Sequence, residues 1–137
     1  MRPARTVIDT NLWISYLISP NSLRIDDLLE RGEVVVLYST ELLSEFIEVA
    51  RRQKFRRYFS LDRIQIVVDV LEEFGELIDV VSDVQTCRDS KDNFLLALSK
   101  DSNADYLVTG DGDLLDIKQF GQTPIVTFSE FAVRISE

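Results

Sequence analysis

Apolar positions along the chain follow two alternating patterns. Short runs rich in β-branched residues read as strands, and longer segments whose apolar residues recur at helical spacing read as helices. The predicted strands are residues 5–9, 34–39, 77–81, 105–110 and 124–128. The predicted helices lie near residues 22–31, 40–53, 61–74, 91–101, 112–118 and 129–135. This alternation predicts an α/β fold, in which helices cover both faces of a parallel sheet.

We expect the whole chain, residues 1–137, to form a single domain. A chain of this length buries roughly two thirds of its unfolded surface in one core, and its 45% apolar and 28% charged residues are typical of a soluble globular protein. No apolar run approaches the roughly 20 residues of a membrane helix, and no signal-peptide segment precedes the first strand. We therefore expect a cytoplasmic location and no membrane contact. The one cysteine, Cys87, fits a reducing compartment.

The net charge, one basic run and the absence of histidine limit the kinds of ligand and catalytic group that we expect. The formal net charge of -9 at pH 7 would repel a nucleic-acid backbone, unless the charge is localised or neutralised by bound cations. One basic run, residues 51–59, interleaves cations with aromatic residues, and is either the solvated end of a helix or a phosphate-binding patch. Its basic residues are Arg51, Arg52, Lys54, Arg56 and Arg57. The chain has no histidine, which excludes Ser-His and Cys-His nucleophiles and histidine-ligated zinc sites.

An ionisable residue follows the first predicted strand. Asp9 comes directly after Val7 and Ile8, where the chain leaves the core at the carboxyl end of the strand. Ligands of open parallel sheets bind outside this edge, so a carboxylate there is well placed for function. The alternative is that Asp9, Thr10 or Asn11 only caps the next helix.

Further carboxylates lie near the starts of two predicted helices. Glu45 borders the apolar face of the helix after the second strand, where a half-buried carboxylate needs a partner. Asp89 and Asp92 precede the apolar run Phe94–Leu98, which predicts a buried helix. We expect Asp89 to be the N-cap, whereas Asp92 lies deeper and is the better candidate for a ligand.

The loop after the fourth strand reads "TGDGDLLD", and offers oxygen ligands from Thr109, Asp111 and Asp113. Its two glycines are expected to let the backbone turn sharply. The spacing does not match a calcium-binding loop, and many Asp/Gly loops are plain turns. The conjunction of acids is more informative, because four or five carboxylates at one sheet edge would repel one another unless cations bind between them. Oxygen ligands without His or Cys indicate Mg²⁺ or Mn²⁺.

Four motifs in this order resemble the PIN domain family, and most closely its small stand-alone members that are toxins of toxin–antitoxin pairs. The motifs are "VIDTN", the glutamate after the second strand, "RDSKDNFLLALS" and "YLVTGDGDLL". The resemblance spans nearly the whole chain, from Val7 to about Phe131. It implies a three-layer α/β/α sandwich around a parallel sheet of about five strands, and divalent-metal-dependent hydrolysis of RNA phosphodiesters.

The resemblance also implies the site. The family's catalytic acids correspond to Asp9, Glu45, Asp92 and Asp111, and these four with Asp113 as an auxiliary acid are the expected metal ligands. Thr10, Asn11 and Thr109 are the expected polar support. One departure from the family pattern is Ser90 with Lys91, where relatives often have proline followed by an acid. Lys91 would weaken the negative potential of the site and the binding of a second metal.

Partners and rival functions also follow from these patterns. The resemblance implies an RNA substrate, a small antitoxin protein and a homodimer. The helix at 61–74 is apolar on more than one side, which burial within the monomer explains more simply than a dimer seam. One rival function is a catalytically silent PIN-like module that binds RNA or protein. Another is a phosphate-accepting signalling domain, which normally needs an adjacent acidic pair early in the chain that this sequence does not have.

Overall fold

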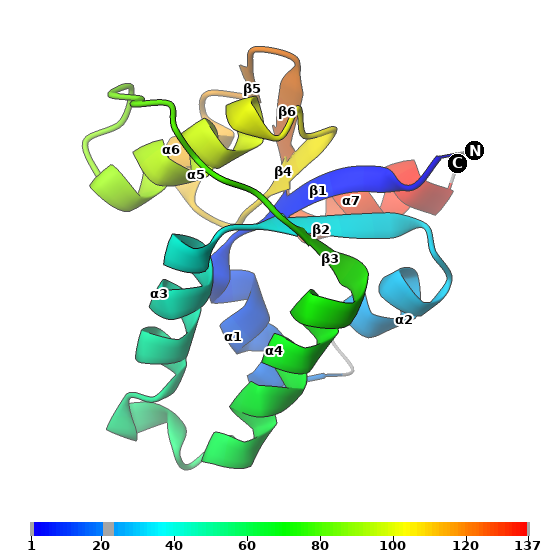
Figure 1. The fold of residues 1–137 in the computed structure, drawn as a ribbon, viewed down its shortest axis with the longest axis vertical. Coiled ribbons are helices and arrows are strands. Elements are labelled where there is room, and N and C mark those ends of the chain that lie inside the picture. The colour runs from blue at the N-terminus through cyan, green and yellow to red at the C-terminus, as the bar shows by residue number, and fades with distance from the viewer. Residues whose placement is uncertain (1, 21–23, 137) are drawn as a thin grey trace.

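The central feature of the fold is a six-stranded sheet with the strand order β3-β2-β1-β4-β6-β5 (Figure 1). The computed structural model describes residues 2–20 and 24–136. The parallel strands are β1 (Ala4–Ile8), β2 (Val34–Tyr38), β3 (Gly75–Leu77), β4 (Tyr106–Val108) and β6 (Thr123–Val126). A short edge strand, β5 (Gln119–Phe120), pairs with β6 in the antiparallel direction. The α/β fold with a mainly parallel sheet is therefore confirmed.

Helices connect the strands and form the outer layers. Their bounds are α1 (Thr10–Ile18), α2 (Ile25–Glu30), α3 (Thr40–Ala50), the 3-10 helix η1 (Gln53–Phe55), α4 (Leu61–Phe74), α5 (Ser90–Asp101), α6 (Gly112–Leu115) and α7 (Phe128–Ser136). Each of the six predicted helices overlaps one of the helices α2 to α7, and four of the five predicted strands match closely. The predicted helix start at residue 22 lies outside the described residues.

Several elements differ from the sequence predictions, among them η1, which follows a helix that ends at Ala50 rather than at residue 53. α1 is absent from the predicted helix ranges, because no glycine or proline separates its pattern from that of β1. Only the alternative interpretation of Asp9 as a helix cap pointed to it. The third strand is Gly75–Leu77 rather than 77–81. The chain leaves the sheet early because the N–H groups of Val81 and Ser82 donate to the Asp101 carboxylate instead, at 2.7 and 2.8 Å. β5 has too few residues to give a pattern.

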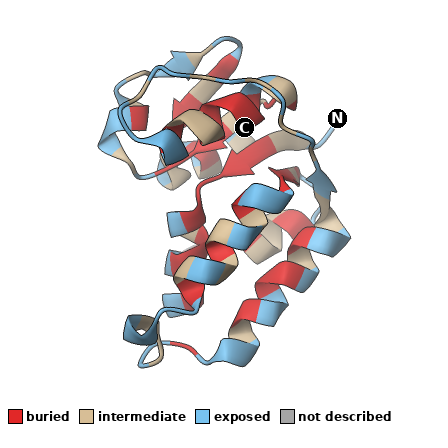
Figure 2. Cartoon of the chain, turned by 60° about the vertical axis from the view of Figure 1, so that its left-hand side comes forward, coloured by how far each residue is buried: buried red, intermediate tan, exposed pale blue. Residues whose placement is uncertain are grey.

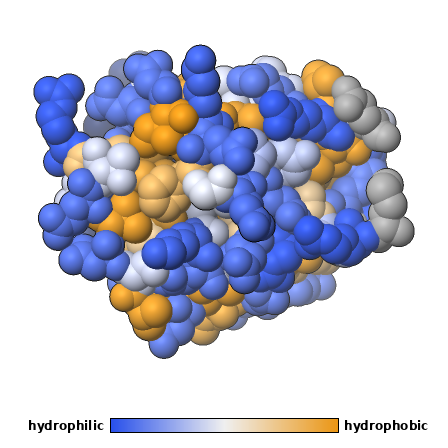
Figure 3. All heavy atoms as spheres, turned by 90° about the horizontal axis from the view of Figure 1, so that it is seen from above, coloured by the Kyte–Doolittle hydropathy of each residue, from blue (hydrophilic) through white to orange (hydrophobic). Residues whose placement is uncertain are grey.

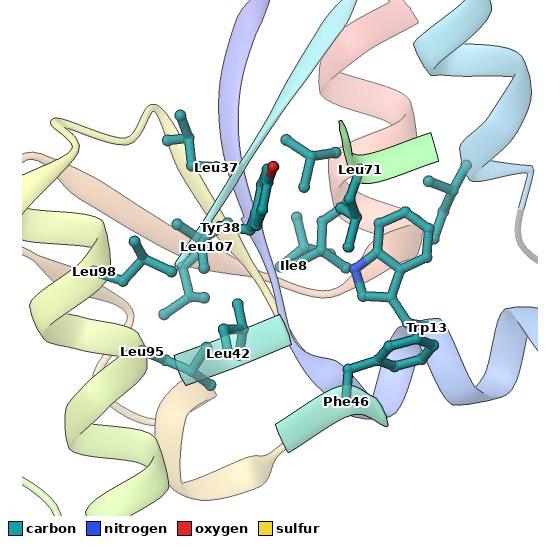
Figure 4. Packing of buried hydrophobic residues seen from close by; sticks show 14 of the residues in the cluster. Ile8, Trp13, Leu37, Tyr38, Leu42, Phe46, Leu71, Leu95, Leu98 and Leu107 are labelled. Atoms are coloured by element: carbon teal, nitrogen blue, oxygen red, sulfur yellow. The ribbon is translucent and has the colours of Figure 1, made fainter. Parts of the chain in front are cut away.

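Apolar side chains fill the space on both faces of the sheet. In Figure 4, Leu37 and Leu107 lie on the side that carries Leu95 and Leu98 of α5. Successive residues of a strand alternate between the two faces. Tyr38 follows Leu37 on β2, and Ile8 follows the β1 partner of Leu107, so both belong to the opposite face. There Tyr38 and Ile8 lie with residues of other helices, among them Trp13 of α1 and Leu71 of α4. Most strand residues are buried, and the helices are buried on one side and exposed on the other (Figure 2).

α4 shows how far the monomer buries an extended apolar helix. Ile64, Val67, Val68 and Leu71 are buried, as expected, while Ile66 on the outer side is 48% exposed.

The face seen in Figure 3 is mostly hydrophilic, with small apolar patches between charged side chains. Among the described residues, no helix is both long enough and apolar enough to span a membrane.

Gly75 allows α4 to run directly into β3. A Cβ at this position would collide with the Leu71 carbonyl and would lie 2.8 Å from the Tyr38 ring. The glycines of the "TGDGD" loop are different. Neither Gly110 nor Gly112 has a positive φ or a close neighbour, so the described structure does not require glycine at either position.

Candidate metal centre

Asp9 occupies the carboxyl end of β1, at the centre of the sheet. Its backbone N–H donates to the Val108 carbonyl at 3.0 Å, which continues the pairing of β1 with β4 past the last strand residue. The side chain is 8% exposed. One carboxylate oxygen accepts from the Asn11 N–H at 3.3 Å, so Asp9 does cap α1. Capping uses only one oxygen, however, and the two interpretations of this residue are compatible.

Thr109 connects Asp9 to the loop that follows β4. Its hydroxyl donates to the other Asp9 carboxylate oxygen at 2.7 Å and accepts from the Asp111 N–H at 3.0 Å. Asp111 in turn caps α6, since its Oδ1 accepts from the Asp113 N–H at 2.9 Å. A chain of hydrogen bonds therefore fixes the acid of β1 relative to the acids of the β4 loop.

Asp92 of α5 (Ser90–Asp101) lies close to the two acids of the loop after β4. It lies in the first turn of α5 and is 5% exposed, whereas Asp89 is the N-cap, as predicted, and accepts from the Lys91 N–H at 2.9 Å. Carboxylate oxygens of Asp92, Asp111 and Asp113 all lie within 4.8 Å of one another. We refer to these three residues together with Asp9 as the acidic centre.

Burial and mutual repulsion disfavour negative charge at two residues of the acidic centre, Asp9 and Asp92. Burial, followed by the charge of Asp111 and hydrogen bonding to it, raises the pKa of Asp92 to about 7. Burial also raises the pKa of Asp9, and the hydrogen bonds from Thr109 and Asn11 oppose this shift. Although Asp9 lies outside the group of three, its charge adds to the repulsion at Asp92. The charges of Asp9, Asp92 and Asp111 are therefore coupled to one another.

Glu45 is not one of the three close carboxylates, and it is linked to the acidic centre through Lys91, the residue before Asp92. It is half-buried on α3, and the partner that the sequence required is Lys91 of α5, whose Nζ lies 3.6 Å from Glu45 Oε1. Lys91 thus connects α5 to α3 through this ion pair.

Thr10 and Asn11 were expected to support the acids together with Thr109, but their side chains make no hydrogen bond to Asp9 in the described structure. The Thr10 hydroxyl is buried without a hydrogen-bond partner among the described residues, and Thr10 lines a small, mainly apolar cavity with Tyr38, Phe46 and Leu71. Asn11 is exposed and contributes its backbone N–H rather than its amide side chain. In the described structure, only Thr109 gives Asp9 a side-chain hydrogen bond.

Sequence reasoning missed the residues that hold the segment 78–89, which carries the chain from β3 to α5. Asp101 anchors the beginning of this segment, through Val81 and Ser82. Asn93 anchors its end, because the amide accepts from the Cys87 N–H at 2.6 Å and donates to the Cys87 carbonyl at 2.9 Å. The only available signal was the position of Asn93 directly after Asp92, at the start of a helix.

The basic run forms the connection between α3 and α4, and its side chains divide into two groups. Phe59 is buried, Phe55 stacks on it at 5.8 Å between ring centroids, and Arg56 donates to the Ala50 carbonyl with its Nε and Nη1 buried. These three residues attach the loop to the body of the protein. The exposed group, which we call the basic loop, is Arg51, Arg52, Lys54, Arg57 and Tyr58.

The donors of the acidic centre fit a hard divalent cation. All are carboxylate oxygens, three of them within 4.8 Å of one another, and such sets suit Mg²⁺ or Mn²⁺ rather than softer metals. A cation would also offset the burial and the repulsion from neighbouring acids, which together raise the pKa of Asp92 to about 7. Asp92, Asp111 and Asp113 would hold it, with Asp9 beside them.

Comparison with known proteins agrees with this geometry. A model of the PIN domain family matches residues 5–113, a range that includes every acid of the centre and Glu45. The chain is also similar to an uncharacterized protein of Methanocaldococcus jannaschii, with 31% identity over 117 residues, covering 83% of this chain and 75% of the relative. The chain therefore belongs to the PIN domain family.

Proposed function

We propose that the protein is a metal-dependent ribonuclease, which hydrolyses RNA phosphodiester bonds at the acidic centre. PIN domains are typically nucleases, and this chain belongs to that family. The observation that carries the proposal is the convergence of Asp92, Asp111 and Asp113 within 4.8 Å at the carboxyl edge of the sheet. Ligands of parallel α/β sheets bind at this edge.

The proposed ligands of Mg²⁺ or Mn²⁺ are Asp9, Glu45, Asp92, Asp111 and Asp113, of which Asp9, Glu45, Asp92 and Asp111 are the proposed catalytic set. A bound divalent cation supplies an activated water at neutral pH and stabilises charge on the phosphate and the leaving oxygen. No histidine is needed for this chemistry, and the chain has none.

Other residues of the chain would prepare the carboxylates. The Thr109 hydroxyl donates to Asp9 at 2.7 Å, which favours the ionised carboxylate and fixes its orientation. The N-cap bond from the Asn11 N–H acts in the same direction on the other oxygen. The cap at Asp111 holds that residue beside Asp92. These contacts reduce the reorganisation needed when the substrate arrives.

We further propose that the basic loop guides the RNA backbone towards the acidic centre. Four exposed cations offset, locally, the net charge of -9 that would repel RNA. Tyr58 is 51% exposed, with the guanidinium of Arg57 at 5.3 Å from its ring centroid, and offers a face on which a base can stack. Arg56, which the sequence grouped with these residues, serves the loop's attachment instead.

The biological setting that we propose is a toxin–antitoxin pair, in which a small antitoxin protein binds the nuclease and the nuclease forms a homodimer. Support for this setting comes from the sequence resemblance to stand-alone PIN toxins. Growth arrest on expression of the wild-type protein, but not of Asp9→Asn, is the expected result. Sedimentation at several concentrations tests the dimer.

The proposed activity is tested with purified protein and an RNA that contains structured and single-stranded regions. We expect cleavage in Mg²⁺ or Mn²⁺, none in EDTA, and a loss of cleavage in Asp9→Asn and Asp92→Asn with the fold retained. Asp69→Asn changes an exposed acid of α4 and serves as the matched control, with activity unchanged. Cleavage that persists in EDTA, or equally in all variants, would contradict the proposal.

A further inference from the structure

Lys91 is the cation nearest in sequence to the acidic centre, and its backbone is fixed. Its N–H donates to the Asp89 carboxylate at 2.9 Å, and the next residue is the buried Asp92. The side chain, by contrast, is 57% exposed and extends across the edge to α3. The ammonium group therefore lies between the first turn of α5, which carries Asp92, and Glu45 of α3.

The contact between Lys91 and Glu45 is weak enough to be exchanged. Its N–O distance of 3.6 Å is beyond a good hydrogen bond. Both side chains are partly exposed, and ion pairs of this kind contribute little to stability. The pair is better explained as a resting arrangement than as a structural contact.

Each member of this pair has a stronger partner available when the site is in use. Glu45 pairs with Lys91, the residue before Asp92 of the group of acids, and carboxylate oxygens suit a divalent cation. Lys91 offers a compact ammonium with three donors, which binds phosphate as a point charge. A phosphate that approaches the acidic centre needs such a cation, because the acids around Asp92 would otherwise repel it.

We propose that Lys91 is a substrate-binding residue, whose ammonium exchanges Glu45 for an RNA phosphate when Glu45 turns to the divalent cation. The inference rests on the proposed nuclease function and adds a phosphate-contacting residue to it. It also gives metal binding and RNA binding a direct link, since both draw on the same ion pair.

The first arm of the test measures Mn²⁺ binding by calorimetry, without RNA. Lys91→Gln frees Glu45, and is expected to bind Mn²⁺ about three- to tenfold more tightly than the wild type. The gain should be smaller when Glu45→Gln is also present, because the pair no longer exists. Lys100→Gln removes an exposed lysine at the far end of the same helix, and should have no effect.

The second arm measures binding of a single-stranded RNA oligonucleotide in Mn²⁺, with Asp9→Asn in every protein to prevent cleavage. Lys91→Gln should weaken binding roughly three- to tenfold and lower the slope of log affinity against log salt by about 0.7. Lys91→Arg should restore most of the affinity, because it keeps the charge.

The outcomes separate the inference from the function on which it rests. A wild-type protein that binds no Mn²⁺ would overturn both. A wild type that binds Mn²⁺, with Lys91→Gln matching Lys100→Gln in either arm, would overturn the role of Lys91 and leave the nuclease proposal intact. Tighter Mn²⁺ binding together with weaker RNA binding, seen only in Lys91→Gln, would support the exchange.

Discussion

The Thr109 hydroxyl donates a 2.7 Å hydrogen bond to the Asp9 carboxylate, although the two residues are 100 positions apart in the chain. They meet because β1 and β4 are neighbours in the sheet and both end at this edge. Thr109 also accepts from the Asp111 N–H, so one side chain fixes two acids. Strand pairing and two hydrogen bonds to one threonine therefore hold Asp9 and Asp111 in fixed positions relative to each other.

Replacing Thr109 with valine tests this connection. Thr109→Val keeps the shape of the side chain but removes the hydrogen bond that lowers the pKa of Asp9, so burial raises that pKa further. Cleavage near neutral pH should fall by about tenfold, and the acidic limb of the pH–rate profile should move to higher pH. Thr109→Ser keeps the hydroxyl and should retain the wild-type profile. A profile that is identical in Thr109→Val would contradict the role of this bond.

Asp92 makes the stability of the metal-free protein depend on pH. Its pKa is raised from the ordinary 3.8 to about 7, so the folded protein holds this proton more tightly than the unfolded chain does. The contribution of Asp92 to the free energy of unfolding is thus complete below pH 3.8 and is lost as the pH rises towards 7. In EDTA, Asp92→Asn should raise the free energy of unfolding at pH 8 by on the order of 2 kcal/mol.

Urea unfolding in EDTA at two pH values measures this effect. The difference between Asp92→Asn and the wild type should be small at pH 4, where the carboxyl is protonated in the folded state. Asp69→Asn, in the exposed part of α4, should show no such dependence on pH. If Asp92→Asn is no more stable than the wild type at either pH, the Asp92 carboxylate stabilises the helix start, and its charge is not a cost to the fold.

Much of the fold was predictable, and the exceptions have local causes. Buried strands such as Val34–Tyr38 give a clear apolar run, and α4 gives a clear helical period. The end of β3 was not predictable, because it depends on hydrogen bonds from Val81 and Ser82 to Asp101, which lies in a later helix. The apolar run that continues past Leu77 looks like strand in the sequence, although the chain has left the sheet.

The candidate site was predictable to a similar degree. The edge rule for parallel sheets and the family resemblance together named each acid of the centre, and the need of Glu45 for a partner was visible from its position on α3. The partner itself, Lys91, could not be identified, because it belongs to another element. Thr10 and Thr109 could not be told apart either, since both are threonines beside an acid and only the strand pairing brings Thr109 to Asp9.

Charge reversal in the basic loop tests the proposed path of the RNA. Arg51→Glu with Arg52→Glu should weaken RNA binding and flatten its salt dependence by about 0.7 per lost phosphate contact. Both arginines are exposed, so the fold should be unaffected. Arg56→Gln is the contrasting variant: it should lower stability, because Arg56 donates to the Ala50 carbonyl, and leave the salt slope unchanged. An unchanged slope in the double variant would remove the loop from RNA binding.

Two glycine substitutions test the packing that positions the sheet. Gly75→Ala should lower the free energy of unfolding by about 1–3 kcal/mol, because its methyl group would collide with the Leu71 carbonyl and the Tyr38 ring. Gly112→Ala has open space and an ordinary φ, and should leave stability unchanged or raise it by up to about 1 kcal/mol. Denaturant unfolding in Mg²⁺-free buffer checks both. Equal effects would show that the close approach at Gly75 is not as described.

The central claim, that the four acids at this edge form a divalent-metal centre, is tested most directly by anomalous diffraction from crystals grown with Mn²⁺. We predict a manganese peak in contact with the carboxylates of Asp92 and Asp111, and its loss in Asp111→Asn. A peak elsewhere, or none at a Mn²⁺ concentration that supports RNA cleavage, would contradict the account.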